Sequence, residues 1–320
     1  MTCGSTPGCS AYSGVGARLG DLVGSETQVA RGERYQNNPD MKKEFNTPDY
    51  ITAIKNQKDK NPFRIINLKQ DNSLGSIANN ENFNMYFLVE DFYGYSAIKP
   101  RSFQDYMDVV GPVNTTIWRM LNVKYLVADR PVPFKGFKEI MSNSKTYVYL
   151  NTNALPRLYF VNQVEQKPDI DVLRSVKNNG FDPKQVAYVN DGKINVDVPD
   201  STASVTITGY KNELVSAEVN ASGNNFLFFG NTYVAGKADY KLFKIPTGWK
   251  AYIDGNQTEI YKVDHGFMGI IVPQGMHKVE FDYAPTSFYI SKYIALVLSS
   301  LVVLGLIITL LFEYKKIKTS

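Results

Sequence analysis

Four side chains of types that bind carbohydrate or phosphate stand out in the sequence: Tyr93, Tyr95, Arg101 and Trp249. The first three lie in FYGYSAIKPRSFQDY, where tyrosine rings could stack on a sugar and the guanidinium could hold a phosphate. Trp249 lies in GWKAYIDG and could stack on a sugar ring. The competing interpretation, which the residue types favour, is packing of helix on sheet for the tyrosine cluster and core filling for Trp249.

Motifs for catalysis are missing from the sequence. It contains two histidines, His265 and His277, and no GxSxG, P-loop or GxGxxG pattern. Asp264 beside His265 suggests an acid–base pair, but neighbouring strand residues point to opposite faces of a sheet. The acidic run DGKINVDVPD lacks the spacing of a calcium-binding loop. We therefore predict no catalytic residue, no metal site and no cofactor.

A membrane helix is predicted near the C-terminus. Tyr293–Phe312 contains no charged residue, and its length of about 20 residues matches the bilayer core. Lys315, Lys316 and Lys318 follow it, whereas Lys292 alone directly precedes it. Because cytoplasmic flanks carry the excess of lysine and arginine, we expect a cytoplasmic C-terminus and an extracytoplasmic body.

That orientation requires an export signal, and residues 1–32 contain neither an apolar core nor a charged start. Two explanations remain open: a tail-anchored chain inserted against its charge bias, or the end of a longer protein with earlier membrane helices. We favour the second and treat residues 1–32 as a disordered or atypical leader. Cys3 and Cys9 lie within it and could form a disulfide or stay unpaired.

The elements predict an α+β fold. Strands are expected at 63–68 and 123–128 and helices at 101–110, 114–121 and 169–180, which gives a mixed α/β domain over 33–184. Short strands separated by turns then predict an immunoglobulin-like β-sandwich over 185–287. These strands are KINVDV, SVTITGY, LVSAEV, NFLFF, WKAYI, TEIYKV, GFMGIIV and HKVEFDY. A transmembrane helix at 288–314 and a basic cytoplasmic tail at 315–320 complete the chain.

Partners are limited by charge. The formal net charge is +4, and the part before the membrane helix contains no lysine or arginine cluster. Nucleic-acid binding proteins present such a cluster, so we predict no nucleic-acid partner.

The order of several motifs resembles the C-terminal part of the YfhO family of bacterial membrane proteins. They are FRIINL, DFYGYSAIKPRSFQDY, MLNVKYLV, LPRLYFV, and GWKAYIDG with the strands that end in HKVEFDYAPTSFYISKYI. The resemblance covers roughly 34–312, and Val234–Thr247 departs from the family pattern. It implies a GT-C-type glycosyltransferase in the bacterial cytoplasmic membrane, which uses a polyprenyl-phosphate sugar to modify cell-surface polymers. The catalytic acid of that class sits in an early loop that this chain does not contain.

Three functions follow from these observations. The first is an accessory domain, with the last membrane helix, of a YfhO-like glycosyltransferase that is not catalytic by itself. Its expected partners are the lipid bilayer, a lipid-linked sugar or cell-surface polymer, and the missing upstream membrane helices. The second is a membrane-anchored glycan-binding or scaffolding module without enzyme activity. The third, an independent surface hydrolase, is disfavoured because the carboxylates form no recognisable constellation.

Overall fold

The computed structural model describes residues 46–71, 74, 77, 82–94, 96, 99–178, 180–190, 192–233 and 248–319. Pro48–Ser320 form one compact unit. The predicted leader, the Cys3–Cys9 question, Tyr95 and Val234–Thr247 lie outside the described residues.

The first sheet has the strand order β2-β1-β3-β5-β4. β1 pairs in parallel with β2 and β3, and β5 pairs antiparallel with β3 and β4. The strands are β1 (Arg64–Leu68), β2 (Glu90–Asp91), β3 (Val123–Ala128), β4 (Phe137–Ser142) and β5 (Tyr147–Asn151). β1 and β3 are almost wholly buried, as strands covered on both faces must be.

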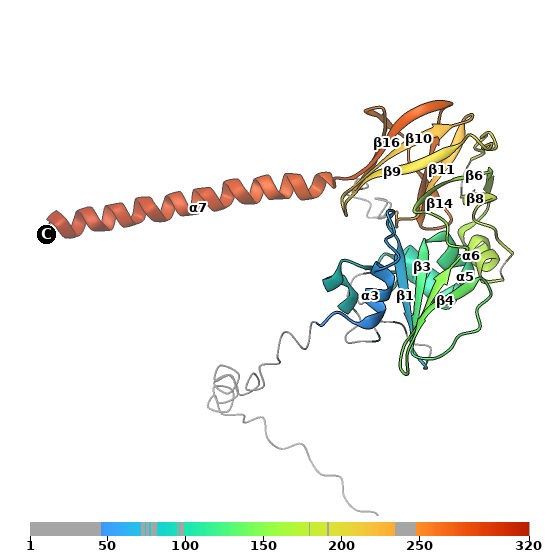
Figure 1. The fold of residues 1–320 in the computed structure, drawn as a ribbon. Coiled ribbons are helices and arrows are strands. Elements are labelled where there is room, and N and C mark those ends of the chain that lie inside the picture. The colour runs from blue at the N-terminus through green and yellow to red at the C-terminus, as the bar shows by residue number, and fades with distance from the viewer. Residues whose placement is uncertain are drawn as a thin grey trace, which may run out of the picture. The chain divides into compact units, whose positions relative to one another are not determined.

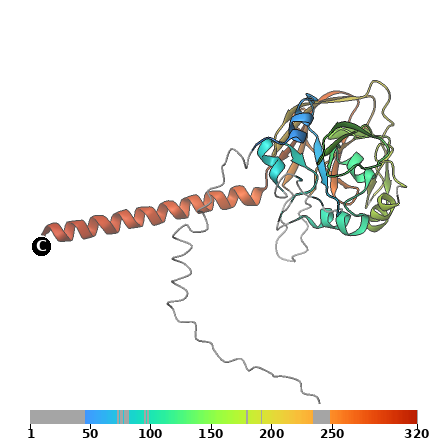
Figure 2. The same ribbon diagram turned by 60° about the horizontal axis from the view of Figure 1, so that its bottom comes forward.

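Helices cover both faces of this sheet (Figures 1 and 2). α3 (Asp49–Lys55) packs Tyr50, Ile51 and Ile54 against one face. On the other side, α4 (Arg101–Asp105) continues as the π-helical turn η3 (Tyr106–Val110), which ends at Gly111 with φ +91°. α5 (Thr115–Met120) then starts from Asn114, whose Oδ1 accepts hydrogen bonds from Thr116 N and Ile117 N at 3.0 Å.

A smaller unit completes this part of the body. β7 (Gln163–Gln166) and β8 (Val186–Val189) pair in parallel and are connected through α6 (Asp169–Lys177). α6 buries Val172, Leu173 and Val176 in the same core that holds Trp118 of α5.

Two antiparallel sheets form the sandwich. The first has the order β13-β12-β16-β10-β9 and the second the order β14-β15-β11-β6. The strands of the first are β9 (Ser204–Tyr210), β10 (Leu214–Ala221), β12 (Trp249–Ile253), β13 (Asn256–Thr258) and β16 (Gly275–Tyr283). Those of the second are β6 (Leu158–Val161), β11 (Asn225–Phe229), β14 (Tyr261–Val263) and β15 (Phe267–Val272).

The second sheet is the middle layer of the body, because both of its faces are buried. In β11, Leu227 and Phe229 face the sandwich core, whereas Phe226 and Phe228 face the core shared with α5 and α6. β6 alternates in the same way and pairs with β11. The pairing of β6 with β11 crosses the domain boundary that we predicted at residue 184.

The predicted α+β class with sandwich-like sheets and one C-terminal apolar helix is confirmed. Two predicted strands were wrong in detail. KINVDV forms no strand, and Asp197 within it donates its backbone N–H to Asn224 O at 2.8 Å. TEIYKV is divided, because Thr258 ends β13 in one sheet whereas Tyr261–Val263 form β14 in the other.

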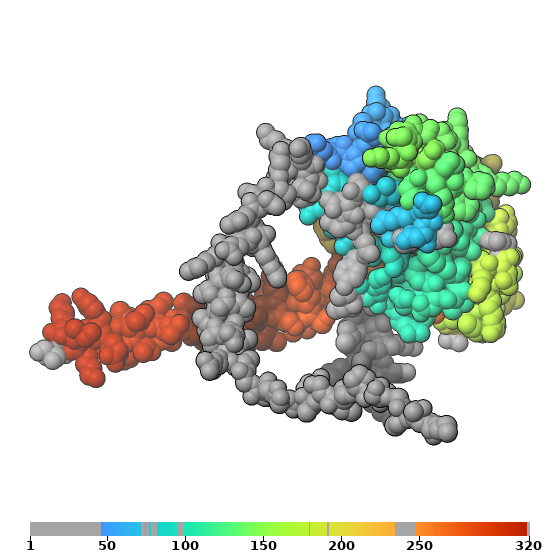
Figure 3. Space-filling model, turned by 90° about the horizontal axis from the view of Figure 1, so that it is seen from below, coloured from blue at the N-terminus to red at the C-terminus, as the bar shows by residue number. Residues whose placement is uncertain are grey.

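The C-terminal helix α7 (Thr286–Thr319) exposes its apolar side chains, and Figure 3 shows it in orange to red. An 18-residue window within Thr286–Lys318 has a mean hydropathy of 2.9, and the helix is long and apolar enough to cross a membrane. Such a surface is unfavourable in water and favourable in lipid. Ala284 and Pro285 are the only residues between β16 and this helix.

Candidate functional site

A buried ionic cluster lies where the first sheet meets the sandwich. Arg157, directly before β6, has a side chain with 0% exposure, and its Nη2 lies 2.9 Å from Glu90 Oε2. Arg64 Nε lies 3.7 Å from the same oxygen. Two guanidinium groups therefore share one carboxylate, which leaves one positive charge in excess.

Hydrogen bonds fix both guanidinium groups. Arg64 Nη1 donates to Leu121 O at 2.9 Å and to Gly230 O at 2.8 Å. Asn231 Oδ1 accepts from Arg64 Nη2 at 2.7 Å and from Arg157 Nη1 at 3.2 Å. These contacts tie β1 to the end of β11, across the boundary between the two sheet systems.

The charges in this cluster change one another's ionisation. Burial, and then the neighbouring Arg157, lower the pKa of Arg64 to about 9. Burial opposes ionisation of Glu90, but Arg157 and Arg64 outweigh it and hold the pKa of Glu90 below its ordinary value. Burial raises the pKa of Tyr210 to about 12, and its phenol is hydrogen-bonded to Glu90. Arg64 and Glu90 are therefore both charged at neutral pH, whereas the phenol of Tyr210 is neutral.

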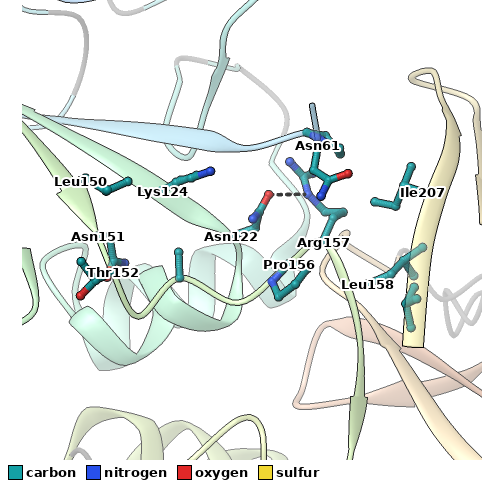
Figure 4. A pocket seen from close by; sticks show the side chains of 13 residues that line it. Asn61, Asn122, Lys124, Leu150, Asn151, Thr152, Pro156, Arg157, Leu158 and Ile207 are labelled. Atoms are coloured by element: carbon teal, nitrogen blue, oxygen red, sulfur yellow. Dashed lines mark hydrogen bonds between the residues drawn. The ribbon is translucent and has the colours of Figure 1, made fainter. Parts of the chain in front are cut away.

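A cavity of about 460 Å³ adjoins Arg157. Asn61, Asn122 and Arg157 gather at its centre, and Ile207 of β9 lies beyond them (Figure 4). Its other lining residues are Pro62, Lys124, Leu150, Asn151, Thr152, Ala154, Pro156, Leu158 and Val205. Asn122 Nδ2 already donates to Leu155 O at 2.8 Å, Thr152 Oγ1 donates to Gly136 O at 2.9 Å, and Lys124 pairs with Asp59. Polar groups beside an apolar wall suit a hydroxyl-rich ligand, which needs hydrogen bonds along its edge and apolar contact on its ring faces.

A second cavity, of about 590 Å³, is lined by residues that include Arg64, Glu90 and Asp91. Asp91 Oδ1 accepts hydrogen bonds from Asn67 Nδ2 at 2.9 Å and Asn84 Nδ2 at 3.0 Å. Burial raises the pKa of Asp91 to about 7, although these two amides oppose the shift. Glu90 and Asp91 are neighbours in β2, yet the pKa of Glu90 is lowered and that of Asp91 is raised.

A separate cluster of charged side chains forms around His265, which connects its own turn to α4 and α6. Its Nε2 lies 2.9 Å from Asp105 Oδ2 of α4, and its Nδ1 lies 3.0 Å from Asp169 Oδ2 of α6, where the alignment is poor for a hydrogen bond. Lys262 Nζ lies 2.9 Å from Asp169. Burial would lower the pKa of His265, but Asp169 and Asp105 outweigh it and raise that pKa.

Asp264 follows β14 in a turn, where its backbone and that of His265 are left-handed, so strand alternation does not set their directions; its carboxylate is directed to β8 and not to this cluster. It is buried, and its Oδ1 accepts the backbone N–H of Tyr188 at 2.8 Å. Burial raises the pKa of Asp264 to about 7. Asp264 and His265 thus form no dyad with each other. The partners of His265 lie about 100 and 160 positions away in sequence, so local spacing gave no signal for them.

The predicted site residues lie in different environments. Tyr93 is partly buried against the core that contains Trp118, and Lys99 Nζ lies 4.4 Å from its ring centroid and 3.1 Å from its hydroxyl. Arg101 begins α4, has an 84% exposed side chain, and places its Nε 2.7 Å from Asp105 Oδ1. Arg101 is thereby joined to the His265 cluster, whereas one face of the Tyr93 ring is covered by Lys99.

Trp249 lies in the sandwich core. It is 7% exposed, and its ring centroid lies 5.7 Å from that of Phe229 and 5.2 Å from that of Tyr283. A ring packed in this way presents no open face to a sugar. Trp249 is buried because it belongs to the sandwich core with Phe229, Ala251 and Phe281.

Metal chemistry finds no support in the described part of the chain, where no group of three His, Cys, Asp or Glu side chains could hold an ion. His277 Nδ1 lies 2.6 Å from Oδ2 of Asp254, a residue of the turn between β12 and β13. Asp191 of the acidic run lies outside the described residues.

Comparison with known protein families gives a match in the second half of the chain. Residues 201–295 match the family described as bacterial membrane protein YfhO, and the matched segment extends from just before β9 into α7. This confirms the resemblance to the C-terminal region of a YfhO family protein over that segment. No curated protein and no solved structure matches the chain. The family and the candidate membrane helix together assign the protein to a membrane.

Proposed function

We propose that this chain is the extracytoplasmic accessory part, with the last membrane helix, of a YfhO-like glycosyltransferase that modifies cell-surface polymers. In this role the body binds the polymer acceptor or a lipid-linked sugar at the membrane surface. The chemical step belongs to membrane helices encoded upstream, and this chain is not catalytic by itself.

The observation that carries the proposal is the cavity beside Arg157. Asn61, Asn122 and Lys124 line it together with the apolar side chain of Ile207, and a ligand would share the Lys124 ammonium with its partner Asp59. Amide and ammonium groups donate to hydroxyl and phosphate oxygens, and the aliphatic wall fits the apolar face of a sugar ring. The cavity belongs to a body that continues, through Ala284 and Pro285, into α7. A ligand bound there would therefore be held near the membrane.

The orientation rests on charge. Lys315, Lys316 and Lys318 follow the apolar run, and such excess favours the cytoplasmic side. The body then lies outside the cytoplasmic membrane, where surface polymers are modified.

The test uses bacteria that lack the gene encoding this chain. We expect a sugar substituent of a cell-surface polymer to disappear on deletion and to return with the wild-type gene. Thr152→Trp should fail to restore it, because the indole fills the cavity from its exposed rim. Thr115→Trp is the matched control, since Thr115 is also exposed, at the start of α5 and away from the residues that line the cavity. Membrane levels of each variant are measured in parallel.

An unchanged sugar content of every surface polymer after deletion would contradict the transferase role. The alternative, a membrane-anchored glycan-binding or scaffolding module, is favoured by the same cavity. It predicts that the purified full chain binds isolated surface polymers and that Thr152→Trp, but not Thr115→Trp, weakens this binding.

A further inference from the structure

A small apolar surface lies on the body at the 3₁₀ helix η2 (Phe83–Phe87) and the residue that follows it. Met85 is 64% exposed, Tyr86 60% and Leu88 95%. We call these three residues the η2 surface. Outside α7, no large apolar side chain of the described residues is more exposed than Leu88. Contiguous exposed apolar side chains usually mark a contact with a partner or a membrane.

Leu88 is unfavourable for the folded chain in two ways. It places an isobutyl group in water, and its backbone is left-handed, with φ 57° and ψ 39°. That conformation costs a residue such as leucine about 1 kcal/mol, whereas glycine or asparagine adopts it readily. A leucine at this position is therefore poorly explained by the fold of the body alone.

The η2 surface is linked to the start of the membrane helix. Met85 and Leu88 line the 590 Å³ cavity together with Asn212, in the turn between β9 and β10. The next residue, Glu213, accepts the backbone N–H of Tyr283 at 2.7 Å. Tyr283 ends β16, and α7 begins at Thr286. The η2 surface thus lies at the end of the sandwich from which the chain enters the bilayer.

Aromatic and basic residues of the kind found at a membrane interface flank this end, beside the acidic Glu213 and Asp282. Phe288 and Tyr289 lie in the first turns of α7, and Lys292 precedes the apolar run. Lys211 lies in the turn beside Asn212. Aromatic rings and lysines flanking apolar side chains are typical of groups that lie among lipid headgroups.

We propose that the η2 surface inserts into the interfacial layer of the bilayer that α7 crosses and so forms a second membrane contact. An interfacial apolar group of this kind is buried about 5–10 Å below the headgroup surface. Two points of attachment restrict rotation of the body about α7. They also hold the cavity of Arg64, Glu90 and Asp91 against the headgroup layer. This inference does not depend on a transferase role.

The test places a reporter at one position of the full chain. Cys3→Ser and Cys9→Ser remove the two native thiols. Leu88→Cys then carries an environment-sensitive fluorophore at the η2 surface. Met276→Cys is the matched control, because Met276 is 81% exposed at the opposite end of β16 from α7. At roughly 3.3 Å per residue, it lies about 23 Å from Tyr283 along the strand.

Both labelled chains are reconstituted in phosphatidylethanolamine–phosphatidylglycerol vesicles that contain a lipid spin-labelled near its headgroup. We expect a blue-shifted emission at position 88 and quenching about twofold or more stronger than at position 276, as for a group inside the interface. Equal water exposure at the two positions would overturn the proposal. Equal quenching at both would also overturn it, because the body would then lie on the membrane without a specific contact at η2.

Discussion

At the scale of single residues, Arg157 shows how one buried charge joins two parts of the body. Its side chain is fully buried and pairs with Glu90, and removal of one partner of such a pair leaves the other poorly compensated. Because Arg64 remains near Glu90, we expect Arg157→Met to lower the free energy of unfolding by about 1–3 kcal/mol. Chemical unfolding in mild detergent, followed by the fluorescence of the buried Trp118 and Trp249, measures the change.

The matched control is Arg174→Met. Arg174 pairs with Asp171 on the surface, where both side chains are at least half exposed. An exposed pair contributes at most about 1 kcal/mol and usually less. Similar small effects of the two substitutions would show that the Arg157 cluster does not hold the sheets together.

Leu88 gives a residue-scale prediction of the opposite sign. Leu88→Asn should raise the free energy of unfolding in detergent by about 0.5–1 kcal/mol, because asparagine tolerates the left-handed backbone. Leu88→Ala keeps the backbone penalty and should change stability little. A loss of stability with asparagine would mean that Leu88 packs on the body and is not reserved for a membrane contact.

At the scale of elements, His265 connects α4, α6 and the turn between β14 and β15. Its pKa is raised in the folded state by Asp169 and Asp105, against the effect of burial. A raised pKa contributes stability that is complete below the unfolded value and is lost as the pH rises through the folded value. We expect His265→Gln to lower the free energy of unfolding by about 1–3 kcal/mol near pH 6 and by less near pH 8. Equal losses at both pH values would exclude the ionic contribution.

Sequence patterns predicted these elements wherever the determinants are local. Gly111 and the cap at Asn114 divide two helices at the expected place, because a positive φ and a side-chain hydrogen bond act within a few residues. The contacts of His265 and Arg157 depend on partners that only the complete topology brings close. The run NFLFF was predicted as one strand and forms β11. Nothing in its sequence indicated that β6 would be its partner in the sheet.

The candidate site was predicted less well than the fold for the same reason. Tyrosine, tryptophan and arginine were selected by type, and residue type does not report burial. Trp249 is in the core, and the lining of the polar cavity includes the asparagines Asn61, Asn122 and Asn151, which the sequence did not distinguish from turn residues. Asn151 satisfies Val123 O at 2.9 Å, so its amide serves the structure as well as the cavity.

At the scale of the whole molecule, the displaced pKa values act together on stability. Burial raises the pKa values of Asp91 and Asp264 to about 7, and that of His265 is also raised. Each group binds a proton more tightly when folded, so its contribution is lost as the pH rises from its unfolded value through its folded value. The pKa values of Glu90 and Asp169 are lowered instead, so their contributions are lost as the pH falls below their ordinary range.

The two groups of shifts predict a maximum of stability at mildly acidic pH. We expect the free energy of unfolding of the full chain in detergent to fall by roughly 2–5 kcal/mol between about pH 5 and pH 8. Asp91→Asn should flatten this fall, because an amide keeps a hydrogen-bonding side chain at the site without the buried charge. Urea titrations of both proteins across this range measure the effect. A stability that is constant or rises toward pH 8 would show that the buried carboxyl groups are ionised without cost, and hence that water reaches Asp91 through the cavity beside η2.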